Sequence, residues 1–289
     1  MSTSENKIAG APISWGVCEV PGWGYQLPPD RVLTEMHDIG LAATELGPEG
    51  FLPTSPEAMA DVLSRHRLHA IGGFTPLLLH RPDHDPLRDV IEVLERYAAT
   101  GARTLVLSAD SGLAGYDTRP TLDEQGWATL LANLDRIDAV AAEHGVRAVL
   151  HPHVGTMIEN GEEVQRVLGG SSIALCLDTG HLLIGGTDPA ELARQVPHRI
   201  AHTHMKDVDL GPGPPGAVRA AHLHGGGPGR YVPPARQWGM SMSQRSSGTC
   251  AGRASTAGTS SSRTPSSPRN PGGRARWPTC IPAPRTCRG

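Results

Sequence analysis

The C-terminal part of the sequence lacks three residue types that the rest of the chain uses freely. Residues 210–289 contain no Asp, Glu or Lys, but they contain 11 Arg. All 29 acidic residues and 15 of the 26 basic ones therefore lie in residues 1–209. The segment 210–289 is rich in Gly, Pro, Ser and Thr, and it has too few large apolar residues to offset the entropy lost on ordering. We predict one domain over 1–209, a usual length for a barrel, followed by a disordered tail over 210–289.

Other absences narrow the class of protein. The sequence has no run of 18 apolar residues, and its N-terminus has no basic segment followed by an apolar one, so neither a membrane span nor a secretory leader is expected. Five Cys without a repeated spacing argue against a disulfide framework. The Arg of the tail are scattered without Lys or interleaved aromatics, which disfavours nucleic acid or an acidic membrane as a partner. We expect a cytoplasmic protein that binds neither; its oligomeric state stays open.

Short apolar runs alternate with amphipathic ones along the first 209 residues, which is typical of βα units around a parallel sheet. A helix is predicted over 128–144, where apolar residues recur every three or four positions, and others are expected to start at Pro29 and after Asp188. Strands are predicted over 7–14, 42–46, 69–74, 104–109, 147–153, 173–180 and 199–205. Seven units predict a (β/α)8 TIM barrel that lacks its last βα unit. A doubly wound sheet is the alternative, although no Gly-rich phosphate loop follows the first strand.

Polar side chains gather where the predicted strands end, which is where barrels of this kind place their chemistry. The candidates are Glu45, His151, His153, Asp178, His181, His202, His204 and Lys206. Any single His is more often a hydrogen-bonded core residue than a ligand. Imidazoles and a carboxylate at three successive strand ends, however, are the donors that a divalent cation needs, so we predict a metal or polyol site there.

Several of these motifs together resemble a known family. "APISWGVCEVPGWG", "TELGPEGFLP", "HPHVGTMIE", "LDTGHLLIGG" and "HTHMKDVD" are similar to the inosose (2-keto-myo-inositol) dehydratases of the xylose-isomerase-like TIM-barrel superfamily, over about residues 7–209. Many epimerases of that superfamily have a Glu at the end of strand five, where this chain has His151. The resemblance therefore implies water loss from a cyclic polyol ketone. A ketose isomerase or epimerase and a non-catalytic polyol-binding barrel stay as alternatives.

The resemblance also implies roles for individual residues. Asp178 and His204 match the superfamily's metal ligands on strands six and seven, and His151 is a third candidate. His181, Lys206 and Glu159 match positions that contact substrate; Lys206 would neutralise an enolate, and Glu45 or Glu159 would move protons. The family further implies cobalt or manganese as the metal and, in some members, glutathione.

The superfamily's fourth metal ligand, a Glu at the end of strand eight, has no counterpart in the tail. The third base of one codon and the first two bases of the next can be read as a shifted frame. Over 254–267 that frame permits "GFDGW-x-VLEQDTVL", and over 240–248 it permits "DVDVAAIVR", which together resemble the missing βα unit. We therefore expect that the tail arises from a frameshift and that this chain binds metal weakly with little turnover. The nucleotide sequence of codons 205–289 would decide the matter.

Overall fold

The computed structural model describes residues 8–18, 25–113, 118–208 and 240–243. All of them fall within one compact unit, residues 1–248. The predicted domain boundary after residue 209 and the predicted disorder of the tail concern residues that, apart from 240–243, lie outside these ranges. Both therefore stay predictions.

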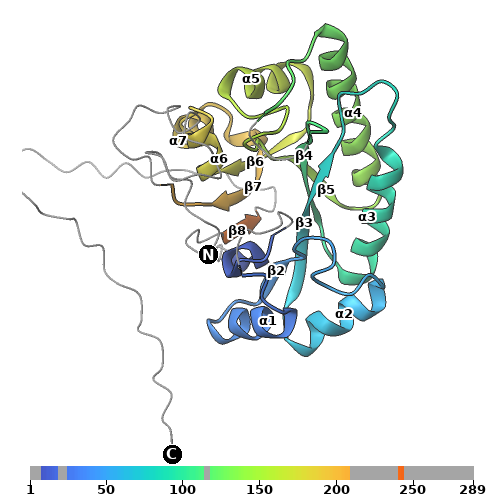
Figure 1. Cartoon of the computed structure of the whole chain (residues 1–289), viewed down its shortest axis with the longest axis vertical. Helices are drawn as coiled ribbons and strands as arrows, with labels where there is room; N and C mark the ends of the chain where they lie inside the picture. The colour runs from blue at the N-terminus through green and yellow to red at the C-terminus, as the bar shows by residue number, and fades with distance from the viewer. Residues whose placement is uncertain (1–7, 19–24, 114–117, 209–239, 244–289) are drawn as a thin grey trace, which may run out of the picture. The chain divides into compact units, whose positions relative to one another are not determined.

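Seven parallel strands follow one another around the sheet in chain order, and helices cover their outer side (Figure 1). The seven predicted strands are confirmed; five are shorter than expected, β4 has its predicted bounds and β3 is longer. Pro152 follows soon after β5, and Asp178 at the end of β6 is the N-cap of the next helix. They are β1 (Ile8–Gly10), β2 (Ala43–Glu45), β3 (His69–Leu77), β4 (Thr104–Ala109), β5 (Arg147–Leu150), β6 (Ala174–Asp178) and β7 (Ile200–Met205). The closed strand order excludes the doubly wound alternative.

Several helices begin at capping residues that the sequence supplies. Asp123 and Asp188 accept backbone N–H groups of the helices that follow them, and Asn160 forms a reciprocal capping box with Glu163. The predicted start at Pro29 is confirmed. The helices are α1 (Pro29–Asp38), α2 (Pro56–Arg65), α3 (Leu87–Thr100), α4 (Glu124–Glu143), α5 (Gly161–Gly170), α6 (Thr179–Ile184) and α7 (Pro189–Gln195), with short 3-10 turns η1 (Pro12–Trp15) and η2 (Pro197–Arg199).

The two faces of the strands have separate apolar environments, because successive side chains of a strand point to opposite sides. On β4, Leu105 and Leu107 belong to the large core between the sheet and the helices, whereas Val106 lies in a second cluster with Val149 of β5 and Cys176 of β6. The second cluster fills the interior of the barrel. Polar residues that share its face at the strand ends therefore point into the barrel as well.

An eighth strand, β8 (Met240–Ser243), pairs antiparallel with both β7 and β1 and closes the barrel. A parallel eighth strand with its helix would fall among residues that are not described, so its predicted absence stays a prediction. The structure instead gives residues 240–243 a pairing with both barrel edges that the sequence does not predict. They contain no Pro, so their amides are available for a ladder, and Met and Ser alternate along them.

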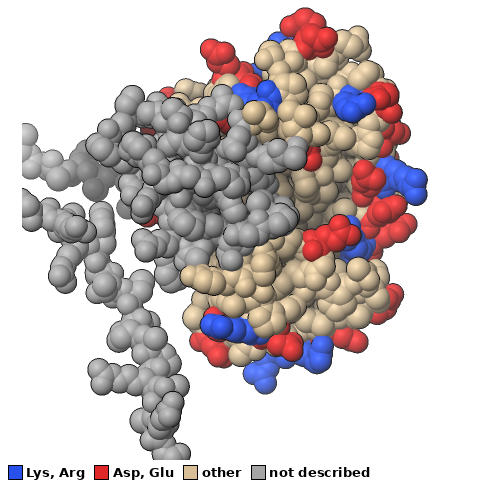
Figure 2. Space-filling view, viewed as in Figure 1, with Lys and Arg blue, Asp and Glu red and all other residues tan. Residues whose placement is uncertain are grey.

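Acidic side chains are spread along the helix-covered edge of the described surface (Figure 2), in line with the acidic composition of residues 1–209. Among the described residues, no helix combines the length and the apolar character that crossing a membrane requires.

Candidate active site

The site lies at the C-terminal ends of β5, β6 and β7, where strand pairing sets its side chains opposite one another. Asp178 of β6 pairs in register with His204 of β7, and Cys176 pairs with His202. His151 follows β5 directly, and its backbone N–H donates to Leu107 on β4. The predicted ligands on three strands are thus brought together at one end of the barrel.

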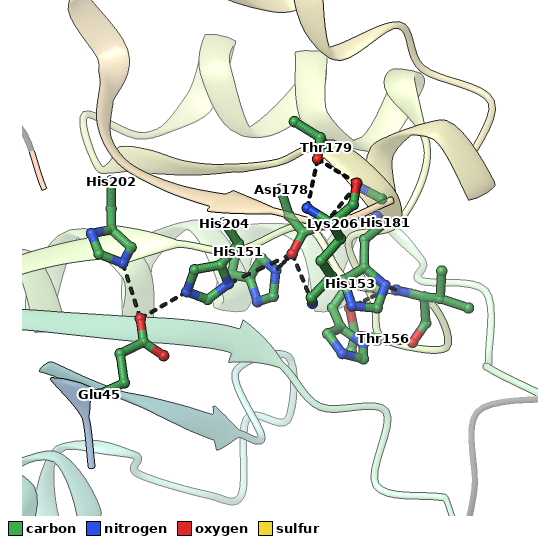
Figure 3. Close-up of polar contacts among 12 residues, drawn as sticks. Glu45, His151, His153, Thr156, Asp178, Thr179, His181, His202, His204 and Lys206 are labelled. Atoms are coloured by element: carbon green, nitrogen blue, oxygen red, sulfur yellow. Dashed lines mark hydrogen bonds and ion pairs between the residues drawn. The ribbon is translucent and has the colours of Figure 1, made fainter. Parts of the chain in front are cut away.

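Asp178 is the centre of the cluster, and the side chains around it converge on one of its oxygens (Figure 3). His151 Nε2 lies 3.0 Å from Asp178 Oδ2, Lys206 Nζ lies 2.8 Å from it, and His204 Nδ1 lies 3.5 Å from it. The other oxygen, Oδ1, accepts the backbone N–H groups of Gly180 and His181 as the N-cap of α6. The helix start therefore fixes the carboxylate, and Oδ2 faces the imidazoles and the ammonium.

Lys206 is held in place through its backbone. Its N–H donates to Thr179 Oγ1 at 2.8 Å, and the Thr179 hydroxyl lies 2.8 Å from the carbonyl oxygen of Lys206. This link ties the end of β7 to the start of α6, and it keeps the Lys206 ammonium beside Asp178.

Glu45 reaches the same cluster from the end of β2. In the strand order of the barrel, β8 and β1 lie between β7 and β2. Its Oε1 lies 3.0 Å from His202 Nε2 and 2.8 Å from His204 Nε2 (Figure 3). His204 therefore lies between two carboxylates, with one ring nitrogen near Glu45 and the other near Asp178.

His153 and His181 lie ring against ring, with centroids 3.7 Å apart. His153 Nδ1 lies 2.8 Å from the carbonyl oxygen of Val154, and the backbone N–H of Val154 is 3.4 Å from His181 Nδ1. The proton of His153 is thus assigned to Nδ1 and that of His181 to Nε2.

Glu159 belongs to a different cluster. Its Oε2 accepts the backbone N–H of Gly155 at 2.8 Å and lies 3.5 Å from Arg119 Nε, while Arg119 also pairs with Glu163 at 2.5 Å. Both Glu159 and Arg119 are largely buried. The structure therefore does not bring Glu159 into the cluster around Asp178.

The charges of the site are set by burial and by the neighbours of each group. Burial lowers the pKa of His151 to about 4, and burial also holds the pKa values of His153 and His181 well below the usual range. Burial opposes ionisation of Asp178, but the Lys206 ammonium and the hydrogen bond from His151 hold the pKa of that carboxyl well below its ordinary value. Three imidazoles are thus neutral beside an ionised carboxylate at pH 7.

Glu45 and His204 stabilise each other's charged forms. Burial opposes ionisation of Glu45, yet the charge of His204 and hydrogen bonds from His202 and His204 hold its pKa well below the usual value. Burial likewise opposes protonation of His204, but Cys176, Glu45 and Asp178 raise its pKa well above the usual value. His204 is therefore the imidazole of the cluster that holds a proton most strongly.

A cavity of about 550 Å³ opens beside these residues. It is large enough for a small cyclic substrate. The site residues that line it are Glu45, Phe74, His151, His153, His204 and Lys206. Asp178 and His181 lie behind this wall, and Glu159 is not among the lining residues.

The donors of the site fit a divalent cation. His151 with Asp178 and His181, and His151 with Cys176 and His204, form two groups whose ligand atoms lie within 4.8 Å of one another. His151 Nδ1 is a buried nitrogen with no hydrogen-bond partner among the described residues, and it carries no proton when Nε2 donates to Asp178. Since buried polar atoms are nearly always partnered, an orphaned nitrogen beside a carboxylate is consistent with a site built to hold an ion.

Two cavity or cluster residues received no role from the sequence. Cys176 stands two positions before Asp178 on the same strand, so both side chains point to the same face. The alternation of a strand could have revealed this, but a single Cys without a motif gave no reason to look for it. Tyr97 on α3 donates to the carbonyl oxygen of Gly73 at 3.1 Å, and burial together with Glu45 raises its pKa. It lies between sequence motifs, so only the folded structure reveals it.

Comparison with known proteins agrees with this geometry. A family model described as xylose isomerase-like TIM barrel matches residues 33–236. The chain belongs to that family. Inosose dehydratase of Geobacillus kaustophilus is 30% identical over 217 residues, which cover 70% of this chain and 69% of that protein. The rhizopine catabolism protein MocC of Rhizobium meliloti is 34% identical over 212 residues, again 70% of this chain, and the chain spans 64% of MocC's length.

Solved structures with the same fold are more distant in sequence. L-ribulose 3-epimerase has a TM-score of 0.56 at 16% identity, with 74% of this chain and 75% of that chain covered. The IolI protein with a bound zinc atom also has a TM-score of 0.56, at 14% identity over 72% of this chain and 74% of that chain. These likenesses show the fold, and the resemblance to inosose dehydratases is confirmed by the sequence relatives.

Proposed function

We propose that the chain removes water from a cyclic polyol ketone of the 2-keto-myo-inositol type, with a divalent cation held by His151, Asp178 and His204. The observation that carries the proposal is the convergence of these side chains on Asp178 Oδ2 beside the 550 Å³ cavity. The relatives named inosose dehydratase support the choice of substrate class.

The reaction breaks a C–H bond next to the ketone and the C–O bond of a β-hydroxyl group, and the proton taken from carbon leaves with the hydroxyl group as water. A carbon acid of this kind is too weak for an unaided side chain near neutral pH, so the negative charge that develops on the ketone oxygen must be stabilised. A divalent cation at the site would supply a Lewis acid for that oxygen. Lys206 lines the cavity, and its ammonium adds a second positive charge at the same wall.

His153 is the group that we propose for accepting the proton. It lines the cavity, and its Nδ1 proton faces the carbonyl oxygen of Val154. Burial keeps the ring neutral at pH 7 but also weakens it as a base, so proton transfer to it depends on the positive charges that stabilise the enolate at the same wall. Its Nε2 is then the nitrogen with acceptor character, and the ring of His181 packs against it at a tilt of 34°. The proton roles predicted for Glu45 and Glu159 stay predictions; of the two, only Glu45 lines the cavity.

The test is to incubate the 289-residue chain with 2-keto-myo-inositol and Mn²⁺ or Co²⁺, with and without glutathione, and to follow the dione product by absorbance. We expect slow water loss, because this chain is predicted to bind metal weakly, and we expect that loss to depend on the cation and to stop when a chelator is added. Arg194→Ala, on the exposed side of α7, is the matched control and should behave like the unmodified chain. Epimerised ketose without dione would favour the epimerase alternative, and polyol binding without any product would favour the binding barrel.

A further inference from the structure

Glu45 makes the longest-range contacts of the site. It stands at the end of β2, and it bonds to His202 and His204 on β7, which lie 157 and 159 residues further along the chain. Glu45 is 5% exposed, His202 0% and His204 9%. Both hydrogen bonds are therefore shielded from water. If one of them broke, no water molecule could easily take its place, so breaking it would cost free energy.

The direction of these bonds fixes where the imidazole protons lie. An ionised carboxylate can only accept hydrogen bonds, so an imidazole nitrogen that bonds to it must carry a hydrogen. Both imidazoles approach Glu45 Oε1 through Nε2. His204 thus has its Nε2 committed as a donor, and the nitrogen left for any other partner is Nδ1, which faces Asp178 Oδ2 at 3.5 Å.

We infer that Glu45 is a positioning residue that keeps a proton on Nε2 of His204 when a cation displaces the proton of Nδ1, and thereby makes Nδ1 the nitrogen that binds the cation. The inference rests on the proposed metal site. A carboxylate that bonds to the far nitrogen of a metal-binding His sets the ring's orientation and raises its donor strength. His202 is the second donor to the same oxygen, and it holds the Glu45 carboxylate in line with His204.

The arrangement also explains why the carboxylate comes from β2. His204 and Asp178 are on neighbouring strands, so a bond between them alone leaves the imidazole free to turn about its Cβ bond. A contact from a strand that is not a neighbour of β7 holds the ring from the opposite side. Because the ring then has a partner on each nitrogen, rotation would break both contacts.

The first experiment reads the protons directly by ¹⁵N NMR of the histidine-labelled chain, without metal and with ¹¹³Cd²⁺. We expect the His204 Nε2–H signal in both states and ¹¹³Cd coupling at Nδ1. The second experiment compares Zn²⁺ affinity of Glu45→Gln with that of Glu163→Gln. Glu163 is a largely buried carboxylate that pairs with Arg119, away from His204. We expect Glu45→Gln to weaken Zn²⁺ binding about 10- to 100-fold and Glu163→Gln to leave it within about twofold.

Several outcomes would overturn the inference. Coordination through His204 Nε2, or a Glu45→Gln affinity equal to that of the control, removes the positioning role. Two cations per chain, one of them lost in His202→Asn, would show that Glu45, His202 and His204 form a metal site of their own. A chain that binds no cation contradicts the proposed function. The NMR spectrum of the metal-free chain still tests the role of Glu45, because a His204 that carries its only proton on Nδ1 overturns that role.

Discussion

Two buried carboxylates on the same rim of the barrel have different partners. Asp178 Oδ2 faces His151, His204 and Lys206, whereas Glu159 is held by the backbone N–H of Gly155 and by Arg119. Imidazoles exchange protons near neutral pH and can give their nitrogen to a cation, but a guanidinium does neither. Burial of a carboxylate therefore does not mark a reactive site; the kind of partner does.

The largest expected effect comes from Asp178→Asn. It removes the only carboxylate on which His151, His204 and Lys206 all converge in the described part of the chain. We expect bound Zn²⁺ or Co²⁺ to fall below about 0.1 equivalents and any turnover to fall at least about 100-fold. Loss of one partner from a buried ion pair should also cost about 3–5 kcal/mol of stability.

Metal analysis and thermal unfolding of Asp178→Asn separate the two effects. Full cation occupancy in a folded variant would show that Asp178 is not a ligand. A folded, cation-free variant supports the assignment, because the fold then survives while the site does not.

The sequence predicts the part of this site that strand ends determine. Parallel strands bring their C-terminal ends to one rim, so the sequence alone places Asp178, His151 and His204 together. The bond between Glu45 and His202 could not, because no local pattern specifies which side chains meet across a barrel. The antiparallel β8 escaped prediction for another reason: Met240–Ser243 is a short segment within a Pro-rich and Gly-rich tail, and its pairing depends on the open edges of β1 and β7.

The second expected effect is that the metal-free chain loses stability in acid. This loss would distinguish the histidine cluster around Asp178 from the Glu159–Arg119 cluster. His151, His153 and His181 have lowered pKa values in the folded state, so the unfolded chain binds more protons below about pH 6.5. Stability should therefore fall as the pH drops from about 6.5 towards 4, and His151 alone should contribute about 3 kcal/mol. Glu45 and Asp178 act in the same direction at lower pH, because their lowered pKa values favour the folded state only while they are ionised.

His204 acts with the opposite sign. Its pKa is raised, so its contribution is complete below about pH 6.5 and is lost as the pH rises through its folded-state value. Urea unfolding of the chelator-treated chain between pH 4 and 9 measures both limbs. Stability that stays flat from pH 6.5 to 4.5 would contradict the assignment of three neutral buried imidazoles.

The smallest expected effect is that of Glu159→Gln, and it tests the other side of the comparison. The amide keeps an oxygen for the N–H of Gly155 but loses the charge beside Arg119, which retains its bond to Glu163. We expect a stability loss of about 1–3 kcal/mol, the usual range for weakening a buried charged contact, with Zn²⁺ affinity unchanged. Urea unfolding and Zn²⁺ titration of the same preparation measure both quantities. A Glu159→Gln variant that is as stable as the unmodified chain but turns over much more slowly would instead support the substrate contact that the family resemblance implies for Glu159. A group that only stabilises the loop after β5 must change the free energy of unfolding when its charge is removed.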